Sequence, residues 1–264
     1  MTRILALGNS HIAMLKQGSA RLQEQFPDAN LEFFSAPGSM FLLGKADENG
    51  IFTPRVRSDR DREVVVRING TDSVDLTKYD EVFVVGHRFF LMVAAELLLE
   101  HDILEGTPTG KARYVSDAFF DASAEAHLKE TAARIHERLG HTNKITFTIA
   151  PYPASSISQR GPEFLFGHTI TTLANHPEGP RLFERWVKQV EKALTDFGYR
   201  FVHQPDETVD GPSTTKPEFS VDAAAGLTET LSEPDHRHMN ADFGFRLLQK
   251  YVTETLNLRQ AQAV

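Results

Sequence analysis

The sequence contains no cysteine, and this absence narrows the chemistry that the protein can carry out. Disulfide bonds, thiolate metal sites and a thiol nucleophile are all excluded. If the protein uses a nucleophile, the attacking atom must therefore be oxygen or nitrogen. The redox compartment of the protein stays undetermined.

Basic residues are outnumbered by acidic ones, 28 against 36, which gives a formal net charge of -8. A surface that binds a polyanion needs clustered lysine and arginine to neutralise phosphates, and this chain does not concentrate them. Nucleic acid is therefore not expected as a partner. The charged run RVRSDRDRE (55–63) mixes both signs and is interpreted as a solvated face rather than a binding site.

Long apolar runs are also missing. The first one begins at Ile4 and lacks both the length of a signal-peptide core and a small-residue cleavage site, which indicates a structural strand and a cytoplasmic protein. The longest apolar stretch starts at Phe89, is interrupted by Glu96 and is too short to span a bilayer. It is expected to form a core helix, and no membrane is expected as a partner.

Short apolar runs alternate with helical patterns along all 264 residues. The strand-like runs lie at 3–8, 31–35, 81–86, 144–150 and 199–203. Apolar residues at helical spacing mark 12–26, 122–139, 180–197 and about 240–257. This alternation predicts an α/β fold, a three-layer α/β/α sandwich with a flavodoxin-like parallel sheet of about five strands. We expect a single domain over residues 1–264.

Two segments, about 41–78 and 204–234, interrupt this pattern and are interpreted as insertions that loop over one edge of the sheet. In the first, EVVVRINGTDSVDL predicts a small hairpin that turns at Asn69–Gly70. The second is rich in proline, threonine and aspartate.

The stretch ILALGNSHIAMLKQG places Ser10 where the first strand gives way to a helix. Ligands of open α/β sheets bind beyond the carboxyl ends of the strands, where a helix start offers free N–H groups and a positive dipole end. Ser10 is then either an N-cap of that helix or a nucleophile. A hydroxyl attacks poorly without a base, so the second role requires a partner elsewhere in the chain.

A candidate partner occurs in SEPDHRHMNADFG (232–244), just before the last predicted helix. Asp235 and His238, three residues apart, can place the carboxylate on imidazole Nδ1 and leave Nε2 free to take a proton from serine. His236 is the rival base. Asp235, His236 and His238 could instead bind a metal, but a catalytic metal needs three or four converging ligands and no second cluster is evident, so no metal is expected.

Together, LGNSH near the start and DHRHMN near the end resemble the first and last blocks of the SGNH, or GDSL-type, hydrolases. The order, nucleophile first and Asp-x-x-His last, covers essentially the whole chain. The resemblance implies that Ser10 is the nucleophile, His238 the general base and Asp235 its orienting carboxylate, with no cofactor. Asn9 stands where the family often has aspartate.

The resemblance also points to donors for an oxyanion hole. The family's second block ends a strand with a glycine, and FFSAPGSM offers Gly38, which otherwise is a turn glycine after Pro37. The third block is usually Gly-x-Asn-Asp, whereas this chain reads VVGHRFF, with Gly86 aligned and Arg88 at the asparagine position. Arg88 either stabilises the oxyanion, holds an anionic substrate or pairs with a surface acid.

Two further histidines follow these motifs directly. His11 and His87 are expected to line the rim of the site, and an exposed polar position without chemistry is the alternative for each.

These features predict a serine esterase that hydrolyses a small or carbohydrate-linked ester through an acyl-enzyme. Transfer of the acyl group to a sugar needs the same residues and is the first alternative. The second is a catalytically impaired domain of the same type that binds a carbohydrate or a protein, which the altered third block favours. The oligomeric state is left open.

Overall fold

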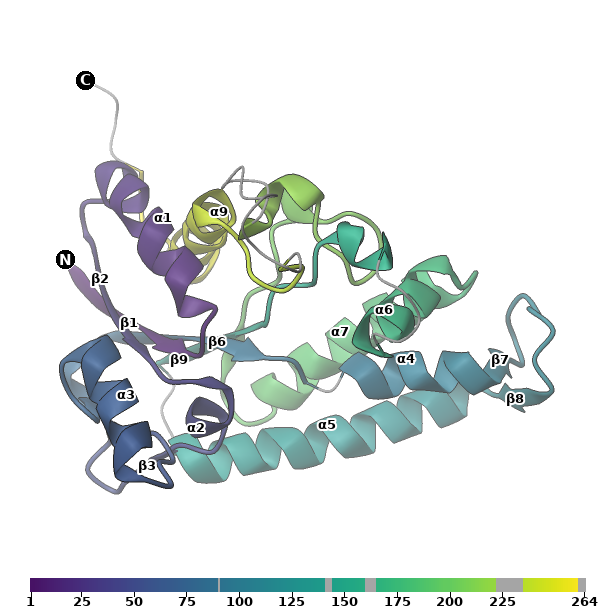
Figure 1. Ribbon diagram of the computed structural model, residues 1–264, viewed down its shortest axis with the longest axis horizontal. Coiled ribbons are helices and arrows are strands. Elements are labelled where there is room, and N and C mark those ends of the chain that lie inside the picture. The colour runs from purple at the N-terminus through teal and green to yellow at the C-terminus, as the bar shows by residue number, and fades with distance from the viewer. Residues whose placement is uncertain (90, 141–143, 160–164, 222–234, 261–264) are drawn as a thin grey trace.

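The structure is a computed structural model that describes residues 1–89, 91–140, 144–159, 165–221 and 235–260. At its centre, five parallel strands form one sheet in the spatial order β10-β9-β6-β1-β2 (Figure 1). They are β1 (Thr2–Gly8), β2 (Ala29–Ser35), β6 (Glu81–His87), β9 (Ile145–Ile149) and β10 (Arg200–Phe201). In chain order this is the 2-1-3-4-5 arrangement of flavodoxin-like sheets, so the predicted topology is confirmed.

Successive side chains of the central strands enter two different hydrophobic cores, one on each face of the sheet. In β1, Leu5 and Leu7 belong to one core, whereas Ile4 and Ala6 belong to the other, and all four are essentially inaccessible to solvent. A strand that is buried on both faces is apolar at most positions instead of alternating with polar ones, which explains the largely apolar runs that mark the inner strands in the sequence.

Helices cover both faces and complete the predicted three-layer α/β/α sandwich. On one face α1 (Ile12–Gln25) packs against α9 (Ala241–Lys250), which a π-helical turn continues over Tyr251–Thr255. On the other face lie α3 (Asp59–Asn69), α5 (Asp117–Leu139) and α7 (Gly179–Thr195). The amphipathic patterns at 12–26, 122–139, 180–197 and 240–257 thus correspond to α1, α5, α7 and α9.

The predicted hairpin at Asn69–Gly70 is wrong, because these residues end helix α3. The Ser58 hydroxyl caps the start of this helix by accepting the Asp61 N–H (3.2 Å), and Gly70 ends it in the left-handed conformation with φ of 76°. The run of valines at 64–66 resembles a strand locally, but the capping residues on either side of it specify a helix. Most of 41–78 is therefore regular structure rather than a loop over the sheet edge.

An antiparallel sheet does form in this segment, with a different turn. It consists of β3 (Lys45–Ala46), β4 (Ile51–Thr53) and β5 (Val74–Asp75), and the chain turns between β3 and β4 through Gly50, whose φ is 79°. A short helix, α2 (Gly38–Leu42), joins β2 to this small sheet.

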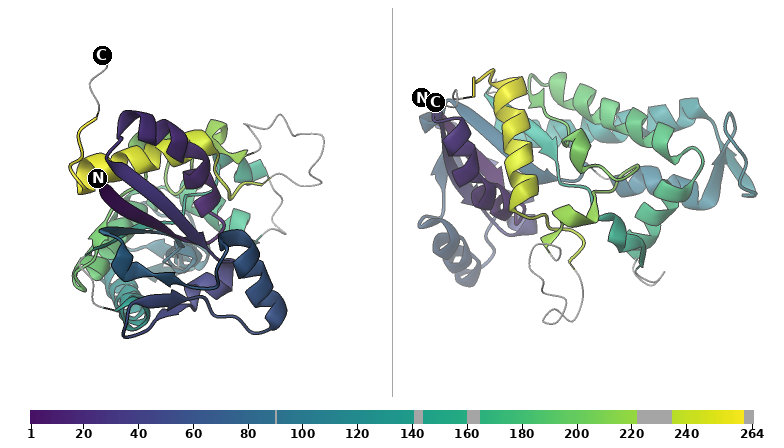
Figure 2. Two further views of the ribbon diagram at one scale, coloured as in Figure 1. Left: turned by 90° about the vertical axis from the view of Figure 1, so that its left-hand side faces the viewer. Right: turned by 90° about the horizontal axis from the view of Figure 1, so that it is seen from above.

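A projection that the sequence did not indicate extends beyond the central sheet. We call it the arm and define it as residues 91–123 and 165–189. It contains α4 (Leu91–Glu100), β7 (His101–Ile103), β8 (Arg113–Val115), α6 (Leu165–Asn175) and the first halves of α5 and α7 (Figures 1 and 2). The apolar stretch that starts at Phe89 supplies α4. Among the helices of the described residues, none combines the length and apolarity needed to cross a membrane.

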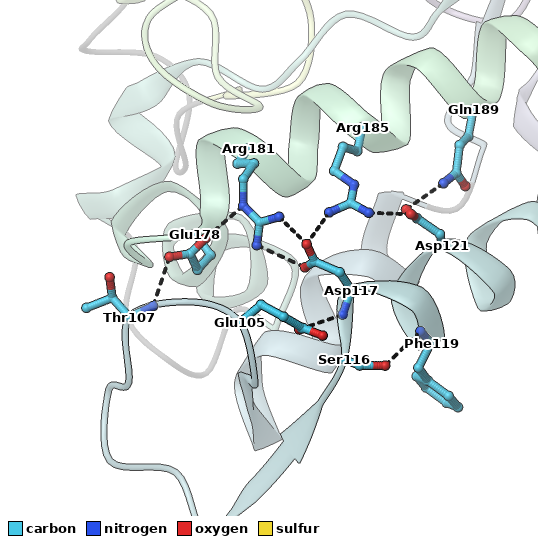
Figure 3. A network of polar contacts seen from close by, with 10 residues as sticks. All are labelled: Glu105, Thr107, Ser116, Asp117, Phe119, Asp121, Glu178, Arg181, Arg185 and Gln189. Carbon is cyan, nitrogen blue, oxygen red and sulfur yellow. Dashed lines mark hydrogen bonds and ion pairs between the residues drawn. The ribbon is translucent and has the colours of Figure 1, made fainter.

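A polar network holds the arm together at the start of α5 (Figure 3). Asp117 accepts two hydrogen bonds from Arg181 (2.5 and 3.0 Å) and one from Arg185 (2.6 Å), and Arg185 also pairs with Asp121. Glu178 accepts from Arg181 (2.8 Å). Opposite charges are thus matched across the α5–α7 interface, which favours one registration of the two helices.

The second predicted insertion, 204–234, is described as far as residue 221, and 222–234 lie outside the described residues. The part from 204 to 221 contains 3₁₀ turns at Asp206–Thr208 and Pro217–Phe219. Its last residues run beside the chain that precedes α9, since the Val221 N–H donates to the His238 carbonyl (3.1 Å).

Candidate active site

Ser10 occupies the turn between β1 and α1, and its side chain is exposed. The turn is closed by backbone hydrogen bonds from the Ile12 N–H to the Asn9 carbonyl (3.0 Å) and from the Ala13 N–H to the Ser10 carbonyl (3.2 Å). The N-cap position of α1 is His11, so the alternative role of Ser10 as N-cap is wrong. Ser10 lies at the carboxyl end of β1, beside the point where the strand order reverses, which is where such sheets bind ligands.

Asn9 fixes the shape of this turn. Its side-chain amide donates to the Gly86 carbonyl (3.1 Å) and its side-chain oxygen accepts the His11 N–H (3.2 Å). Gly86 has φ of 117°, and a Cβ there would lie 2.5 Å from the Asn9 side-chain oxygen. Only glycine fits this position, so Asn9 and Gly86 form a lock between the ends of β1 and β6.

His238 and Asp235 meet Ser10 in a continuous chain of hydrogen bonds. Ser10 Oγ lies 2.7 Å from His238 Nε2, and His238 Nδ1 lies 2.6 Å from Asp235 Oδ2. A carboxylate only accepts, so Nδ1 carries the imidazole proton and donates it to Asp235; Nε2 is then free to accept from the serine hydroxyl. The three residues are thus connected in the order that the sequence predicts.

The carboxylate of Asp235 is held in its ionised form. The hydrogen bond with the His238 imidazole lowers the pKa of Asp235 well below the usual range of a carboxyl. Asp235 Oδ1 also accepts hydrogen bonds from the backbone N–H groups of Arg237 (2.9 Å) and His238 (3.1 Å), and these lower the pKa further. The Asp235 and His238 side chains are each 32% exposed, so the imidazole is accessible from outside while its Nδ1 is engaged.

The contact between α1 and α9 brings the two ends of the chain together. A Cβ at Gly244 would lie 2.0 Å from the Met14 carbonyl oxygen, and a Cβ at Gly18 would lie 2.4 Å from the Phe245 nitrogen. The absence of side chains at these two glycines lets the helix backbones approach closely. Because α1 starts just after Ser10 and α9 starts just after His238, this approach sets the distance between the hydroxyl and the imidazole.

Asn240 anchors the turn that carries His238. It is the N-cap of α9, with its side-chain oxygen accepting the Asp242 and Phe243 N–H groups. Its side-chain amide donates to the carbonyls of Glu218 (2.8 Å) and Ser220 (3.2 Å). The capping residue therefore ties the start of α9 to the 204–221 segment. An asparagine before a helix can be recognised from the sequence as a cap. The two carbonyls that accept from its side-chain amide cannot be recognised in this way.

His236 contacts a different serine, Ser156. Its Nδ1 lies 3.0 Å from Ser156 Oγ, its carbonyl accepts the Ala154 N–H (2.8 Å), and the residue is buried. The geometry thus favours His238 over His236 as the partner of the serine. Within the described ranges, no group of three or more histidine, cysteine, aspartate or glutamate residues is arranged to hold a metal ion.

His11 lies beside His238 and is buried, so the alternative of an exposed position is wrong for this residue. Its ring centroid is 5.2 Å from that of His238. Burial, together with the positive charge of Arg88, lowers the pKa of His11 to about 3. The imidazole of His11 is therefore neutral at ordinary pH and adds no positive charge next to His238.

Gly38 and Arg88 follow the two strands that flank β1. Gly38 is the exposed first residue of α2, and no atom lies within 4 Å of the place where its Cβ would be. The Ala36 N–H donates to the Gly8 carbonyl (3.1 Å), which brings the segment before Gly38 to the end of β1. Burial and then Arg237 lower the pKa of Arg88. Their roles in an oxyanion hole stay predictions.

His87 packs among aromatic side chains. Its ring lies 5.4 Å from that of Phe41, 5.6 Å from Phe89 and 5.8 Å from Phe147. All three partners belong to the hydrophobic core on the α5 side of the sheet. Burial lowers the pKa of His87 to about 4, so it is a neutral member of this cluster. These contacts are typical of core packing. They do not support the prediction that His87 lines the rim of the site.

Comparison with known proteins assigns no family. No family model matches the chain, and no curated protein matches it. Among solved structures, the periplasmic domain of a Salmonella ser. Paratyphi A lipopolysaccharide acetyltransferase is 15% identical over 97% of this chain and 84% of its own, with a TM-score of 0.38. A DUF4886 family protein from Bacteroides uniformis is 12% identical over 98% of this chain and 99% of its own, with a TM-score of 0.33. Both likenesses are too distant to support a function.

Proposed function

We propose that the protein is a serine hydrolase that acts on ester bonds, with Ser10 as the nucleophile. The observation that carries the proposal is the hydrogen-bonded chain from Ser10 Oγ through His238 to Asp235, at 2.7 and 2.6 Å. A nucleophile, a base and an orienting carboxylate in this order activate a hydroxyl that is otherwise unreactive near neutral pH. The two sequence blocks that resemble SGNH hydrolases contribute these same three residues.

In the first half-reaction, Ser10 Oγ attacks the carbonyl carbon of the ester while His238 Nε2 takes the hydroxyl proton. The imidazolium that forms is stabilised by the Asp235 carboxylate, which stays ionised because its pKa is low. The tetrahedral intermediate then collapses, the bond to the alcohol breaks, and His238 returns the proton to the leaving oxygen. The product is an acyl group on Ser10.

In the second half-reaction, water replaces the alcohol. His238 takes a proton from the water, the hydroxide oxygen attacks the acyl carbon, and the proton returns to Ser10 Oγ as the acid leaves. In both halves a negative charge develops on the carbonyl oxygen. The backbone N–H groups of Ser10 and Gly38, together with Arg88, are the proposed donors to this oxygen, and such a donor typically contributes about 10²–10³ in rate.

The proposed substrates are small or carbohydrate-linked esters. A sugar hydroxyl in place of water would turn the same cycle into acyl transfer, because only the acceptor changes. Product analysis with an acetyl donor, in the presence and absence of a sugar acceptor, separates the two: acetate alone indicates hydrolysis, and an acetylated sugar indicates transfer.

Hydrolysis of short-chain aryl esters tests the proposal. We expect measurable turnover by the wild type and its loss, by at least about 10³-fold, in Ser10→Ala. Ser19→Ala is the matched control, since Ser19 is a half-buried serine on α1 whose hydroxyl donates to the Lys16 carbonyl (2.8 Å). Equal turnover by Ser10→Ala and Ser19→Ala would refute the nucleophile assignment. If the wild type turns over no ester and binds a carbohydrate as well as Ser10→Ala does, the protein is a binding domain instead.

A further inference from the structure

A pocket of about 240 Å³ opens next to α2. Its walls come from two segments, the short helix α2 with the residue after it and the chain that leads into α3. The lining residues are Ser39, Met40, Leu43, Arg55, Arg57 and Asp61. The sequence predicts a solvated face for the charged run at 55–63. In the structure, Arg55, Arg57 and Asp61 of this run line a concave surface.

The pocket lies close to the proposed oxyanion donor along the chain. Gly38 is the first residue of α2 and Ser39, the next residue, already lines the pocket. Helix α2 has five residues and therefore extends on the order of 7 Å. Since the Ala36 N–H is bonded to the Gly8 carbonyl at the end of β1, α2 starts at the same edge of the sheet as Ser10. The pocket is therefore lined by the helix whose first residue is the proposed oxyanion donor.

Two guanidinium groups give the pocket a positive charge. Arg55 and Arg57 are exposed, and neither forms an ion pair with a carboxylate of the described residues. The one acid in the wall, Asp61, already accepts the Arg57 backbone N–H (2.9 Å). The arm differs in this respect, because the guanidinium of Arg181 there is matched by carboxylates. The pocket thus keeps unmatched positive charge in a protein whose net charge is -8.

Backbone contacts hold the two walls together. The Arg55 N–H donates to the Met40 carbonyl (2.9 Å), which ties the start of the charged segment to α2. The cap of α3 by Ser58, which accepts the Asp61 N–H, fixes the other end of this segment. The two arginines therefore project from a backbone that is anchored on both sides, so ligand binding has to order their side chains but not the backbone that carries them.

We propose that this pocket binds a carboxylate or phosphate group of the substrate, so that the preferred ester is an anionic one. The inference rests on the proposed function, because it assigns a subsite to the reaction at Ser10. Guanidinium groups bind these two anions through paired, charge-assisted hydrogen bonds, and two of them around one cavity match a group with two or three oxygens.

The test measures the preference of the enzyme for anionic over neutral esters. We compare kcat/KM for neutral 4-nitrophenyl acetate, for 4-nitrophenyl hemisuccinate, whose acyl part carries the charge, and for 4-acetoxybenzoate, whose alcohol part carries it. In the Arg55→Gln/Arg57→Gln double variant, we expect the ratio of anionic to neutral kcat/KM to fall by about tenfold or more for one of the two anionic esters. Inorganic phosphate should inhibit the wild type competitively and the double variant more weakly.

Arg60→Gln is the control, since Arg60 is an exposed arginine of the same charged run that does not line the pocket. It should leave the ratio unchanged. An unchanged ratio in the double variant, with Ser10-dependent hydrolysis intact, overturns the subsite and leaves the proposed function standing. An equal fall in Arg60→Gln overturns the pocket in favour of a general charge effect. Absence of any Ser10-dependent hydrolysis refutes the function, and the subsite with it.

Discussion

The arm and the candidate active site each contain an aspartate whose pKa lies below its usual range because of a hydrogen-bonded partner. For Asp117 in the arm, the principal partner is the Arg181 guanidinium; for Asp235 in the site, it is the His238 imidazole. A guanidinium keeps its protons at any working pH, so the first pair only holds two helices together. An imidazole can release and accept a proton, and its second nitrogen contacts a hydroxyl.

The difference shows what makes a hydrogen-bonded network a candidate for catalysis. An imidazole in the middle of the network can transfer a proton, and a hydroxyl at its end can react. The arm contains more charges and more hydrogen bonds than the site. In the network at the start of α5, the charged groups are carboxylates and guanidinium groups, which do not exchange a proton near neutral pH, whereas the site ends on the exposed Ser10 hydroxyl. The predictions below test this contrast from the largest expected effect to the smallest.

Removal of the proposed base should have the largest effect. His238→Ala should lower kcat/KM for an aryl ester by at least about 10³-fold, because the serine loses its base. His236→Ala should lower it less than about fivefold, because this ring contacts Ser156 and not Ser10. Steady-state kinetics of both variants, after thermal melts have shown that each is folded, provides the measurement. The opposite ranking would transfer the base assignment to His236.

Disturbing the helix contact that brings the site together should come next. Gly244→Ala should lower the free energy of unfolding by about 1–3 kcal/mol, because the added Cβ meets the Met14 carbonyl oxygen at 2.0 Å. Helix propensity alone favours alanine over glycine by about 1 kcal/mol, so a loss of stability identifies the packing as the cause. Ester turnover should fall as well, since the shifted helices separate Ser10 from His238. Denaturant unfolding that shows a more stable variant would contradict this account of the contact.

In the arm, Asp117→Asn should affect stability and leave the reaction alone. At pH 7 we expect a loss of about 1–2 kcal/mol, because two arginines lose their shared carboxylate. The Asp117 pKa is lowered in the folded state, so its contribution is present above the usual carboxyl pKa of 3.8 and disappears as the pH falls through the lowered value. Urea unfolding at pH 7 and in strong acid should show the two proteins converging, with kcat changed less than about twofold. A large fall in kcat would mean that the arm takes part in the reaction.

The smallest effect is expected at the second histidine of the site. Burial lowers the pKa of His11 to about 3, so its imidazole stays neutral near neutral pH. His11→Gln should therefore leave the shape of the pH–rate profile unchanged, although it alters packing next to the base. A displaced acid limb in the profile of kcat/KM against pH would show that His11 shares the proton.

The sequence was informative where the signal is local. The inner strands β1, β6 and β9 are buried on both faces, so they appear as short, largely apolar runs, and the amphipathic helices between the strands show a clear period. Asp235 and His238 lie three residues apart in one turn, so their contact follows from spacing alone. The pairing with Ser10 across the whole chain was implied by the resemblance of the first and last sequence blocks to the SGNH hydrolases, because no local pattern connects residues 228 positions apart.

Other features depend on contacts that no local pattern contains. The valines at 64–66 favour a strand by propensity, and the helical outcome is set by the residues at 58 and 70 that cap it. The lock between Asn9 and Gly86 joins two strand ends 77 residues apart, and the anchor of Asn240 joins α9 to a loop. The arm arises from helix pairs that pack on one another beyond the sheet, so their periodicity gave no sign of where they lie.

The central claim is that Ser10 is activated by His238, and covalent labelling tests it most directly. A fluorophosphonate reacts with an activated serine in proportion to its nucleophilicity, and peptide mass spectrometry identifies the modified residue. We predict a single adduct on the peptide that contains Ser10, absent in Ser10→Ala and formed far more slowly in His238→Ala. An adduct on a different serine, or the same labelling rate with and without the His238 imidazole, would contradict the account.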